Sequence, residues 1–314
     1  MISMNLTSGA KTAVKQCMNI QPGESVLIIT DTNMPKPITN ALFEASKKIT
    51  KNTVIKEMQP LKVEGQEPLP EIAEMMKSPD VLFLVTSKSL SHTKARREAS
   101  KSGVRIASMP KVPVESFING GMTADYDVIV ENCRKMSKSI KGKTNIHVTS
   151  PNGTDVTLRI GQYILEIDDG IYQEPGSFGN LPGGEVSTAP DRYSTNGELV
   201  IDKMGDYGEN IRIGIKNGYA IRLQGSEKLK SIILDLGKDS RNIAEIGIGT
   251  NPKAKIIGNI LEDEKVYGTV HMALGNNMTY GGDCGVPFHD DGIILKPTLE
   301  ADGVTLIKDG KWMV

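Results

Sequence analysis

Short apolar segments alternate with segments of helical spacing in the N-terminal half, and this alternation limits the possible folds more than any other feature. The apolar segments, each of strand length, lie at residues 25–30, 53–58, 81–87 and 104–109. The segments of helical spacing between them lie at residues 36–48, 71–76 and 93–102. Because strands joined by helices of this length form parallel sheets with helices on their faces, we predict an α/β domain. No glycine-rich phosphate-binding motif accompanies it.

The sequence changes character after a helix predicted over residues 126–141. Two hairpin signals follow, since Pro151-Asn152-Gly153 and Asn217-Gly218 each join two strand-like segments. One further helix is predicted over residues 227–236, and glycines are frequent throughout this half. We therefore predict an α/β domain with a parallel-type sheet at residues 1–142. A largely antiparallel α+β domain, which carries the metal site, is predicted at residues 143–314.

Composition excludes several classes of partner. The net charge is −1, so no electrostatic footprint indicates a nucleic acid or a membrane surface. The longest apolar runs have about five residues, whereas a membrane-spanning helix needs about 20. The three cysteines are too few and too widely spaced for a disulfide framework. With no apolar signal segment at the N-terminus, we expect a cytoplasmic protein without nucleic-acid or membrane partners.

The chemistry is expected in the C-terminal half, where two of the four histidines lie among acidic residues. In the segment 267–274, His271 alternates with the apolar positions and therefore points away from the apolar side of a strand. If residues 289–291 are extended, His289 and Asp291 share one face and Asp290 points to the other. An imidazole and a carboxylate on one strand face are a suitable pair of ligands for a divalent metal.

Two glutamates are further candidates. Glu185 follows Leu181-Pro182-Gly183-Gly184, and we expect this approach to hold its carboxylate at the apex of a loop. Glu245 begins a predicted strand on which it shares a face with Gly247 and Gly249. A carboxylate beside two glycines has open space next to it, which a ligand site needs and a packed core avoids.

Structural interpretations of the same residues stay open at this point. A glutamate at the start of a strand, such as Glu245, is usually solvated, and a histidine in a strand, such as His271, is more often hydrogen-bonded structure than ligand. The run Glu262-Asp263-Glu264 is normally a charged turn. For Cys284, the alternatives are a thiolate nucleophile or ligand and a small buried cysteine in a turn.

Four ordered blocks resemble the metal-site segments of the M29 aminopeptidases, which are the aminopeptidase T/S or thermophilic metalloprotease family. The blocks are residues 180–190 (NLPGGEVSTAP), 244–250 (AEIGIGT), 268–275 (GTVHMALG) and the pair at 289 and 291. The resemblance covers residues 145–291, and the N-terminal half fits in layout only. It implies a homodimer whose carboxylate and histidine ligands hold one or two zinc, cobalt or manganese ions.

Carried over residue by residue, the resemblance implies six metal ligands, with Glu245 expected to bridge two ions. These ligands are Glu185, Glu245, Glu264, His271, His289 and Asp291. Metal ions would activate a water molecule for attack on the N-terminal peptide bond of a small peptide. Glu185 or Glu264 is the candidate general base if it is not a ligand. The first prediction is therefore a metal-dependent aminopeptidase-like hydrolase.

One departure from the M29 pattern supports a different reaction. The peptidases carry a tyrosine seven residues after the histidine of the third block, whereas this chain has Met278 there and Tyr280 two residues later. The same superfamily includes 2,5-dihydroxypyridine dioxygenase, whose His, His, Asp triad resembles His271, His289 and Asp291. The alternative prediction is thus a mononuclear non-haem Fe(II) ring-cleaving dioxygenase. A second alternative is an inactive relative that binds a small molecule.

Overall fold

The computed structural model describes residues 2–314, and the chain divides into two compact units. The first unit comprises Met1–Val130, Asp168–Gly183 and Asn251–Lys255, and the second comprises Glu131–Ile167, Gly184–Thr250 and Ile256–Val314. Neither unit is a continuous segment, whereas the sequence predicts a single boundary after residue 142. The two short returns to the first unit carry no strong periodicity, so nothing in the sequence pattern marks them.

The first unit contains a five-stranded sheet with the order β2-β1-β3-β4-β8, in which every pairing is parallel. Its strands are β1 (Val26–Asp31), β2 (Thr53–Met58), β3 (Val81–Val85), β4 (Arg105–Ser108) and β8 (Phe178–Asn180). Its helices are α1 (Ile2–Thr12), α2 (Lys36–Lys47), α3 (Pro70–Met75), α4 (Lys94–Lys101) and α5 (Val114–Ile118). The predicted α/β arrangement is confirmed.

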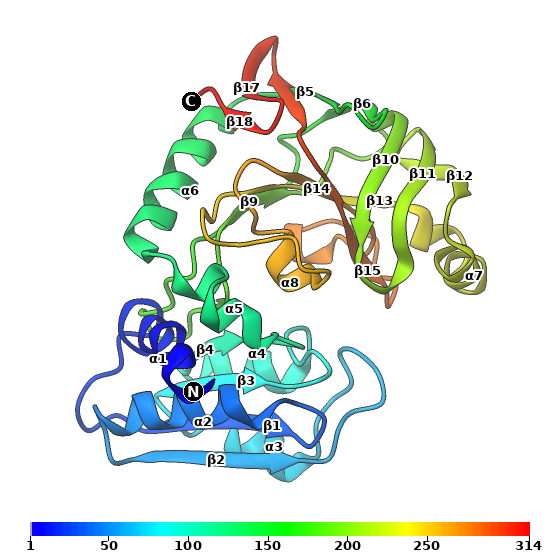
Figure 1. Ribbon diagram of the computed structural model, residues 1–314. Coiled ribbons are helices and arrows are strands. Elements are labelled where there is room, and N and C mark those ends of the chain that lie inside the picture. The colour runs from blue at the N-terminus through cyan, green and yellow to red at the C-terminus, as the bar shows by residue number, and fades with distance from the viewer. Residues whose placement is uncertain (1) are drawn as a thin grey trace. The chain divides into compact units, whose positions relative to one another are not determined.

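Helices cover both faces of this sheet, with α2 on one side and α3 and α4 on the other (Figure 1). β1 and β3 are buried along their whole length, which explains why their sequences are continuous apolar runs. On the side of α3 and α4, Leu27, Leu82 and Leu84 pack with Ile72 and Ala99 in one hydrophobic cluster. Burial of these side chains holds the unit together.

A substitution in this cluster tests the packing. Leu84 on β3 is fully buried, so Leu84→Ala is expected to lower the free energy of unfolding by about 2–5 kcal/mol through lost burial and a residual cavity. Urea unfolding measures the change. Leu69→Ala is the matched control because Leu69 is exposed. An equal effect of both substitutions would contradict the assigned core.

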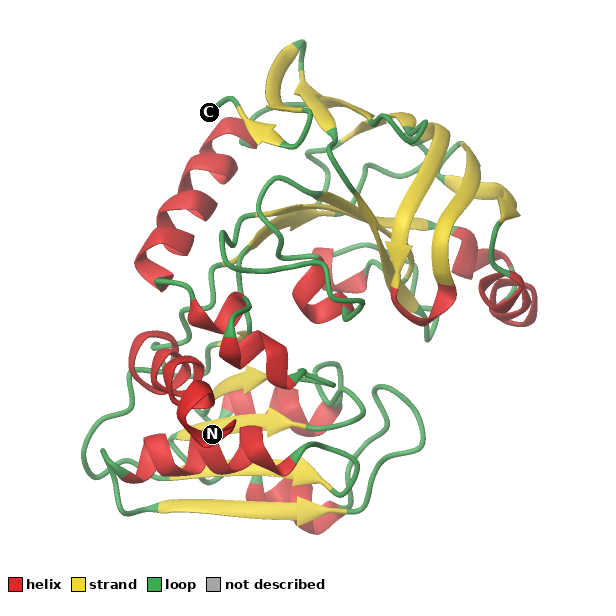
Figure 2. Cartoon of the chain, viewed as in Figure 1, coloured by secondary structure: helices red, strands yellow, loops and turns green. Residues whose placement is uncertain are grey.

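The second unit is built on one large curled sheet of 13 strands (Figure 2). Its main path runs β18-β17-β16-β5-β6-β10-β15-β14-β13-β9-β7, with β11 and β12 added beside β10. The strands are β5 (Asn145–Thr149), β6 (Asp155–Arg159), β7 (Leu165–Asp168), β9 (Glu185–Thr188), β10 (Asn196–Met204), β11 (Gly208–Lys216), β12 (Tyr219–Gln224), β13 (Ile243–Gly249), β14 (Val270–Gly275), β15 (His289–Ile294), β16 (Thr298–Ala301), β17 (Val304–Lys308) and β18 (Lys311–Trp312).

All registered pairings in this sheet are antiparallel, which confirms the predicted character of the C-terminal half. Both predicted hairpins are present, as β5–β6 and β11–β12. Asn217 and Gly218 have φ values of 49° and 75°, and two successive positive φ values are what a two-residue turn of type I′ requires. The helices are α6 (Tyr126–Ile140), α7 (Glu227–Leu236) and α8 (Ile260–Asp263).

Among the helices of residues 2–314, none combines the length and the apolar character that crossing a bilayer requires. The homodimer and the cytoplasmic location expected above stay predictions.

Candidate metal centre

Four neighbouring strands, β9, β13, β14 and β15, present five polar side chains on one face of the large sheet. The register pairs Gly247 with His271, and it pairs Ala273 with both Glu245 and Asp291. Directly opposed residues lie on the same face, as do alternate residues along each strand. The side chains that share this face are Glu185, Glu245, His271, His289 and Asp291. The predicted strand alternation is therefore present.

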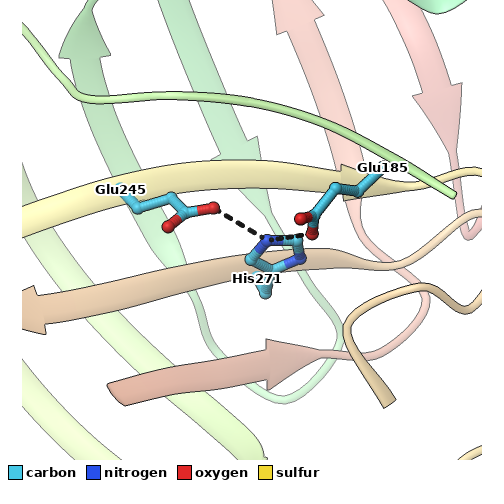
Figure 3. A group of neighbouring side chains, drawn as sticks. All are labelled: Glu185, Glu245 and His271. Atoms are coloured by element: carbon cyan, nitrogen blue, oxygen red, sulfur yellow. Dashed lines mark hydrogen bonds and ion pairs between the residues drawn. The ribbon is translucent and has the colours of Figure 1, made fainter. Parts of the chain in front are cut away.

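Glu245 lies at the centre of this cluster and contacts both imidazoles. Its Oε1 is 3.2 Å from Nε2 of His271, and its Oε2 is 3.0 Å from Nε2 of His289. His271 also faces Glu185, with Nε2 3.3 Å from Oε2 (Figure 3). Asp291 Oδ2 lies 3.7 Å from Nε2 of His289. Nδ1 of His289 lies 2.6 Å from the carbonyl oxygen of Asn276, which fixes the plane of the ring.

Two sets of side chains place their ligand atoms within 4.8 Å of one another, and Glu245 belongs to both. The first set is Glu185, Glu245 and His271, and the second is Glu245, His289 and Asp291. The triad His271, His289 and Asp291 is not one of the sets found among the described residues, because Glu245 lies between the two histidines.

The donor atoms of the cluster fit a divalent cation. Oδ1 of Asp291 is buried and has no hydrogen-bond partner among the described residues, and Oε2 of Glu185 is buried with only the 3.3 Å contact to Nε2 of His271. Buried polar atoms in folded proteins are normally paired. Carboxylate oxygens and imidazole nitrogens with spare capacity are what zinc, manganese and non-haem iron bind.

The glycines of β13 have a different role from the one the sequence suggests. A Cβ atom at Gly247 would lie 2.0 Å from Nε2 of His271, and a Cβ at Gly249 would lie 2.0 Å from the carbonyl oxygen of Val266. The expected open space beside Glu245 is therefore occupied by the imidazole and by the backbone that precedes β14. Without these glycines, neither could lie against the strand.

The acidic run before His271 is buried rather than a solvated turn. Glu262, Asp263 and Lys265 have no exposed surface and Glu264 retains 8%. Asp263 accepts hydrogen bonds from the backbone N–H groups of Ile257 and Gly258, at 2.7 and 3.1 Å, which fixes the segment. The interpretation as a charged surface turn is therefore wrong.

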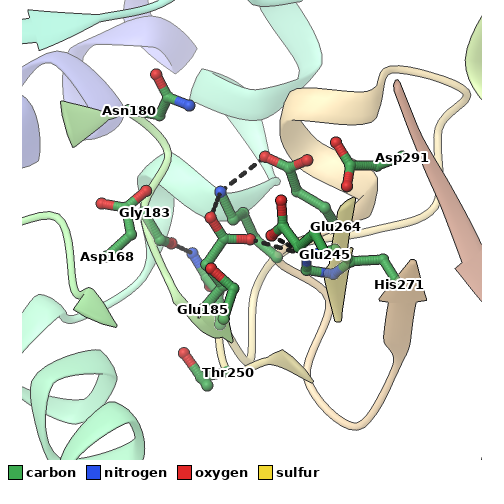
Figure 4. Close-up of polar contacts among 12 residues, drawn as sticks. Asp168, Asn180, Gly183, Glu185, Glu245, Thr250, Glu264, His271 and Asp291 are labelled. Carbon is green, nitrogen blue, oxygen red and sulfur yellow. Dashed lines mark hydrogen bonds and ion pairs between the residues drawn. The ribbon is translucent and has the colours of Figure 1, made fainter. Parts of the chain in front are cut away.

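Lys265 joins two of the predicted ligands. Its Nζ is 2.6 Å from Oε1 of Glu185 and 2.7 Å from Oε1 of Glu264. Figure 4 labels these two glutamates together with Glu245, His271 and Asp291. Glu264 belongs to neither metal-binding set. Lys265 was not among the residues predicted from the sequence. The available signal was a run of four charged residues, 262–265, shortly before the strand that carries His271.

The charged groups of the cluster strongly shift one another's pKa values. Burial opposes a charge on His271, yet Glu185 and Glu245 outweigh burial and raise the pKa of His271 well above its ordinary value. Burial also acts on Glu245, but both histidines hold its pKa well below the usual range. His289 is the most exposed member, with 31% of its side-chain surface accessible, and Asp291 and Glu245 raise its pKa against burial.

Two carboxyl groups at the edge of the cluster have raised pKa values, in contrast to the lowered pKa of Glu245. Burial, together with the negative charge of Glu245, raises the pKa of Asp291 to about 6. Burial raises the pKa of Glu264 to about 8, with help from the charges of Glu185 and Asp291 and against the effect of Lys265. Glu264 therefore keeps its proton at neutral pH.

Tyr280, and not Met278, supplies a phenol beside the cluster. Met278 and Tyr280 are the ends of a short 3₁₀ helix, in which the Met278 side chain is exposed and Tyr280 is buried. The hydroxyl of Tyr280 lies 2.9 Å from Oγ of Ser187 on β9. Burial raises the pKa of Tyr280 well above its ordinary value, and the charges of Glu245 and Glu185 add to the effect.

Cys284, which the sequence left open as a nucleophile or ligand, and the histidine His147 lie in ordinary structural contacts. Sγ of Cys284 donates to the carbonyl oxygen of Asp239 at 3.2 Å, which supports the interpretation as a turn cysteine. His147 pairs with Asp155 across the β5–β6 hairpin at 2.8 Å.

Comparison with known proteins identifies the family. A family model described as NicX, 2,5-dihydroxypyridine 5,6-dioxygenase, matches residues 5–314, which is nearly the whole chain. The chain belongs to the NicX family. It is therefore a homologue of an enzyme.

A relative from Pseudomonas putida KT2440, 2,5-dihydroxypyridine 5,6-dioxygenase, is 26% identical over 230 residues. The match covers 67% of this chain and 64% of the relative, which is less than two thirds of its length. The solved structure of 2,5-dihydroxypyridine dioxygenase from the same organism superposes with a TM-score of 0.82, at 18% identity, over 99% of this chain and 98% of that chain. At this identity the superposition shows a common fold.

The same fold extends to AmpT from Thermus thermophilus, an M29 aminopeptidase, with a TM-score of 0.71 at 15% identity over the full length of both chains. At this identity the superposition shows the fold alone. The assignment as a hydrolase and aminopeptidase of the M29 family is wrong, because the NicX family model and the curated relative are both dioxygenases.

Gly247→Ala tests the packing of the imidazole against β13. The added Cβ displaces His271, so metal affinity is expected to fall by about 10–100-fold, as it does when groups that orient a ligand are lost. Equilibrium dialysis with metal analysis measures the affinity. Gly214→Ala on β11 is the control, because its Cβ meets only Arg222 at an ordinary 3.5 Å. Unchanged affinity in Gly247→Ala would rule out His271 as part of the site.

Tyr280→Phe tests the contact with Ser187. Loss of this buried hydrogen bond is expected to lower the free energy of unfolding by about 1 kcal/mol. Urea unfolding measures the change, and Tyr193→Phe serves as control because Tyr193 is exposed. If Tyr280→Phe were as stable as the unmodified chain, the contact would contribute nothing to the fold.

Proposed function

We propose that this chain is a mononuclear non-haem Fe(II) dioxygenase that cleaves a hydroxylated aromatic ring of the 2,5-dihydroxypyridine type. The observation that carries the proposal is the histidine and carboxylate cluster on one sheet face, in a chain that matches the NicX family over residues 5–314. The substrate class follows from the name of the Pseudomonas putida relative, 2,5-dihydroxypyridine 5,6-dioxygenase.

His271, His289 and Asp291 would hold the iron, and Glu245 lies beside both histidines. Two histidines and one carboxylate are the ligand set of many non-haem iron oxygenases, in which further positions on the ion stay open. A bound Fe(II) ion would supply the one-electron chemistry that allows dioxygen to react with an aromatic ring. The unpaired Oδ1 of Asp291 supports its assignment as a ligand.

The chain's own residues orient and shield the site. The two oxygens of Glu245 each contact one imidazole Nε2, which sets the directions of both rings. His271 has no exposed surface and Glu245 retains only 5%, so bulk water is excluded from this side of the cluster. His289, at the more exposed side, marks where a substrate would enter.

Glu264 is the proposed proton carrier for a ring hydroxyl. Its carboxyl group lies at the edge of the cluster, 2.7 Å from Nζ of Lys265, and its pKa of about 8 leaves it protonated at neutral pH but within reach of ionisation. A carboxyl group with a pKa near the working pH is suited to both giving and accepting a proton. The predicted catalytic role of Glu264 is kept, with a different reaction.

Oxygen consumption tests the proposed function. Protein loaded anaerobically with Fe(II) is expected to consume one molecule of dioxygen per molecule of 2,5-dihydroxypyridine, with loss of the ring absorbance. His289→Ala and Asp291→Ala are expected to lose iron and activity together, since each removes a ligand. His147→Ala is the control, because His147 lies on the β5–β6 hairpin. An iron-loaded chain that consumes no oxygen with any dihydroxylated ring would overturn the proposal.

A further inference from the structure

Lys265 places a buried ammonium group against the cluster. Its side chain has no exposed surface, and its Nζ lies between Oε1 of Glu185 and Oε1 of Glu264, at 2.6 and 2.7 Å. A buried ammonium is costly unless carboxylates neutralise it at close range. Both distances are those of close ion pairs, so the ammonium lies between the two carboxyl groups.

The two metal-binding sets differ in which charged groups pair with their carboxylates. In the set Glu185, Glu245 and His271, one carboxylate already pairs with Lys265. In the set Glu245, His289 and Asp291, the ion pairs are those of His289 with the two carboxylates. The first set therefore contains a cation supplied by the chain, whereas the second offers its carboxylates to an ion from solution.

We propose that the Lys265 ammonium takes the place of a second metal ion beside Glu185, so that the chain binds a single dication. The proposal concerns the number of ions and rests on the proposed function only in assigning a metal to this cluster. It names Lys265 as the residue that determines a mononuclear centre.

The ion pair between Lys265 and Glu185 supports this assignment. One carboxylate of the first set already has a cation 2.6 Å from its Oε1. A dication in the same set would place two further positive charges beside the buried ammonium, and uncompensated buried charge is strongly unfavourable.

The backbone around Lys265 is held against β13 and positions this side chain between Glu185 and Glu264. Gly249 lets the carbonyl oxygens of Val266 and Glu264 approach β13, because a Cβ there would lie 2.0 and 2.9 Å from them. Asp263 closes the preceding turn through its hydrogen bonds to two backbone N–H groups. The lysine is thus placed by the fold and not by a flexible loop.

Metal stoichiometry tests the proposal. The metal-free chain is dialysed to equilibrium against Mn²⁺, bound manganese is measured by mass spectrometry, and electron paramagnetic resonance reports whether two ions are coupled. The unmodified chain is expected to bind one ion. Lys265→Met, which keeps the length and removes the charge, is expected to bind two ions that are magnetically coupled through Glu245. Lys230→Met is the control, since this lysine is half-exposed on α7 and pairs with Glu227.

Either of two metal stoichiometries would overturn the proposal: two ions in the unmodified chain, or one ion in a folded Lys265→Met variant. A double variant, Lys265→Met with Glu185→Gln, removes the ion pair as a unit and is expected to fold and bind one ion. If Lys265→Met alone is unfolded without metal, Mn²⁺ is expected to restore its circular dichroism spectrum. Failure of Mn²⁺ to do so, while the double variant folds, also contradicts the proposal.

The stoichiometry does not depend on catalysis, so the two proposals fail separately. A chain that binds one Mn²⁺, and two after Lys265→Met, but consumes no oxygen would retain the role of Lys265 and lose the dioxygenase function. If the unmodified chain consumes oxygen but the folded Lys265→Met variant binds one ion, the dioxygenase function would be retained and the role of Lys265 would be lost.

Discussion

Both histidines of the candidate metal centre meet on one buried carboxylate, that of Glu245, and the rest of the centre is arranged around this contact. A carboxylate in this position is costly unless it is paired, and the imidazoles of His271 and His289 satisfy its two oxygens. The pairing requires β13 to be flanked by β14, with β15 next in the sheet. The large antiparallel sheet therefore determines the chemistry, because only its register brings these strands together.

Small residues on β13 make this arrangement possible. Gly247 leaves room for the ring of His271, and Gly249 leaves room for the backbone that carries Glu264 and Lys265. A charged cluster of this density is stable only if opposite charges lie within a few ångströms of one another. Close approach of backbone and side chains to the strand provides that proximity, and larger side chains on β13 would prevent it.

The fold alone does not decide the reaction. AmpT and the dioxygenase of Pseudomonas putida share this architecture with the present chain, at identities of 15% and 18%. The four sequence blocks that resemble the M29 peptidases specify strands and ligand positions common to such a scaffold, so they were a poor guide to the substrate. The departure at Met278 was the better guide, since it pointed away from peptide hydrolysis.

The sequence by itself determined the parallel and antiparallel sheets and the strand alternation that places His271, Glu245 and the pair His289 and Asp291. Those properties depend on local periodicity and turn chemistry, such as the Asn217-Gly218 turn and the alternation around His271. Only the tertiary structure decided that the two compact units are discontinuous, that Tyr280 reaches Ser187, and that the charged run ending at Lys265 is buried. A charged residue is buried only when distant partners neutralise it, and the partner here, Glu185, lies 80 residues earlier in the chain, beyond the reach of any local pattern.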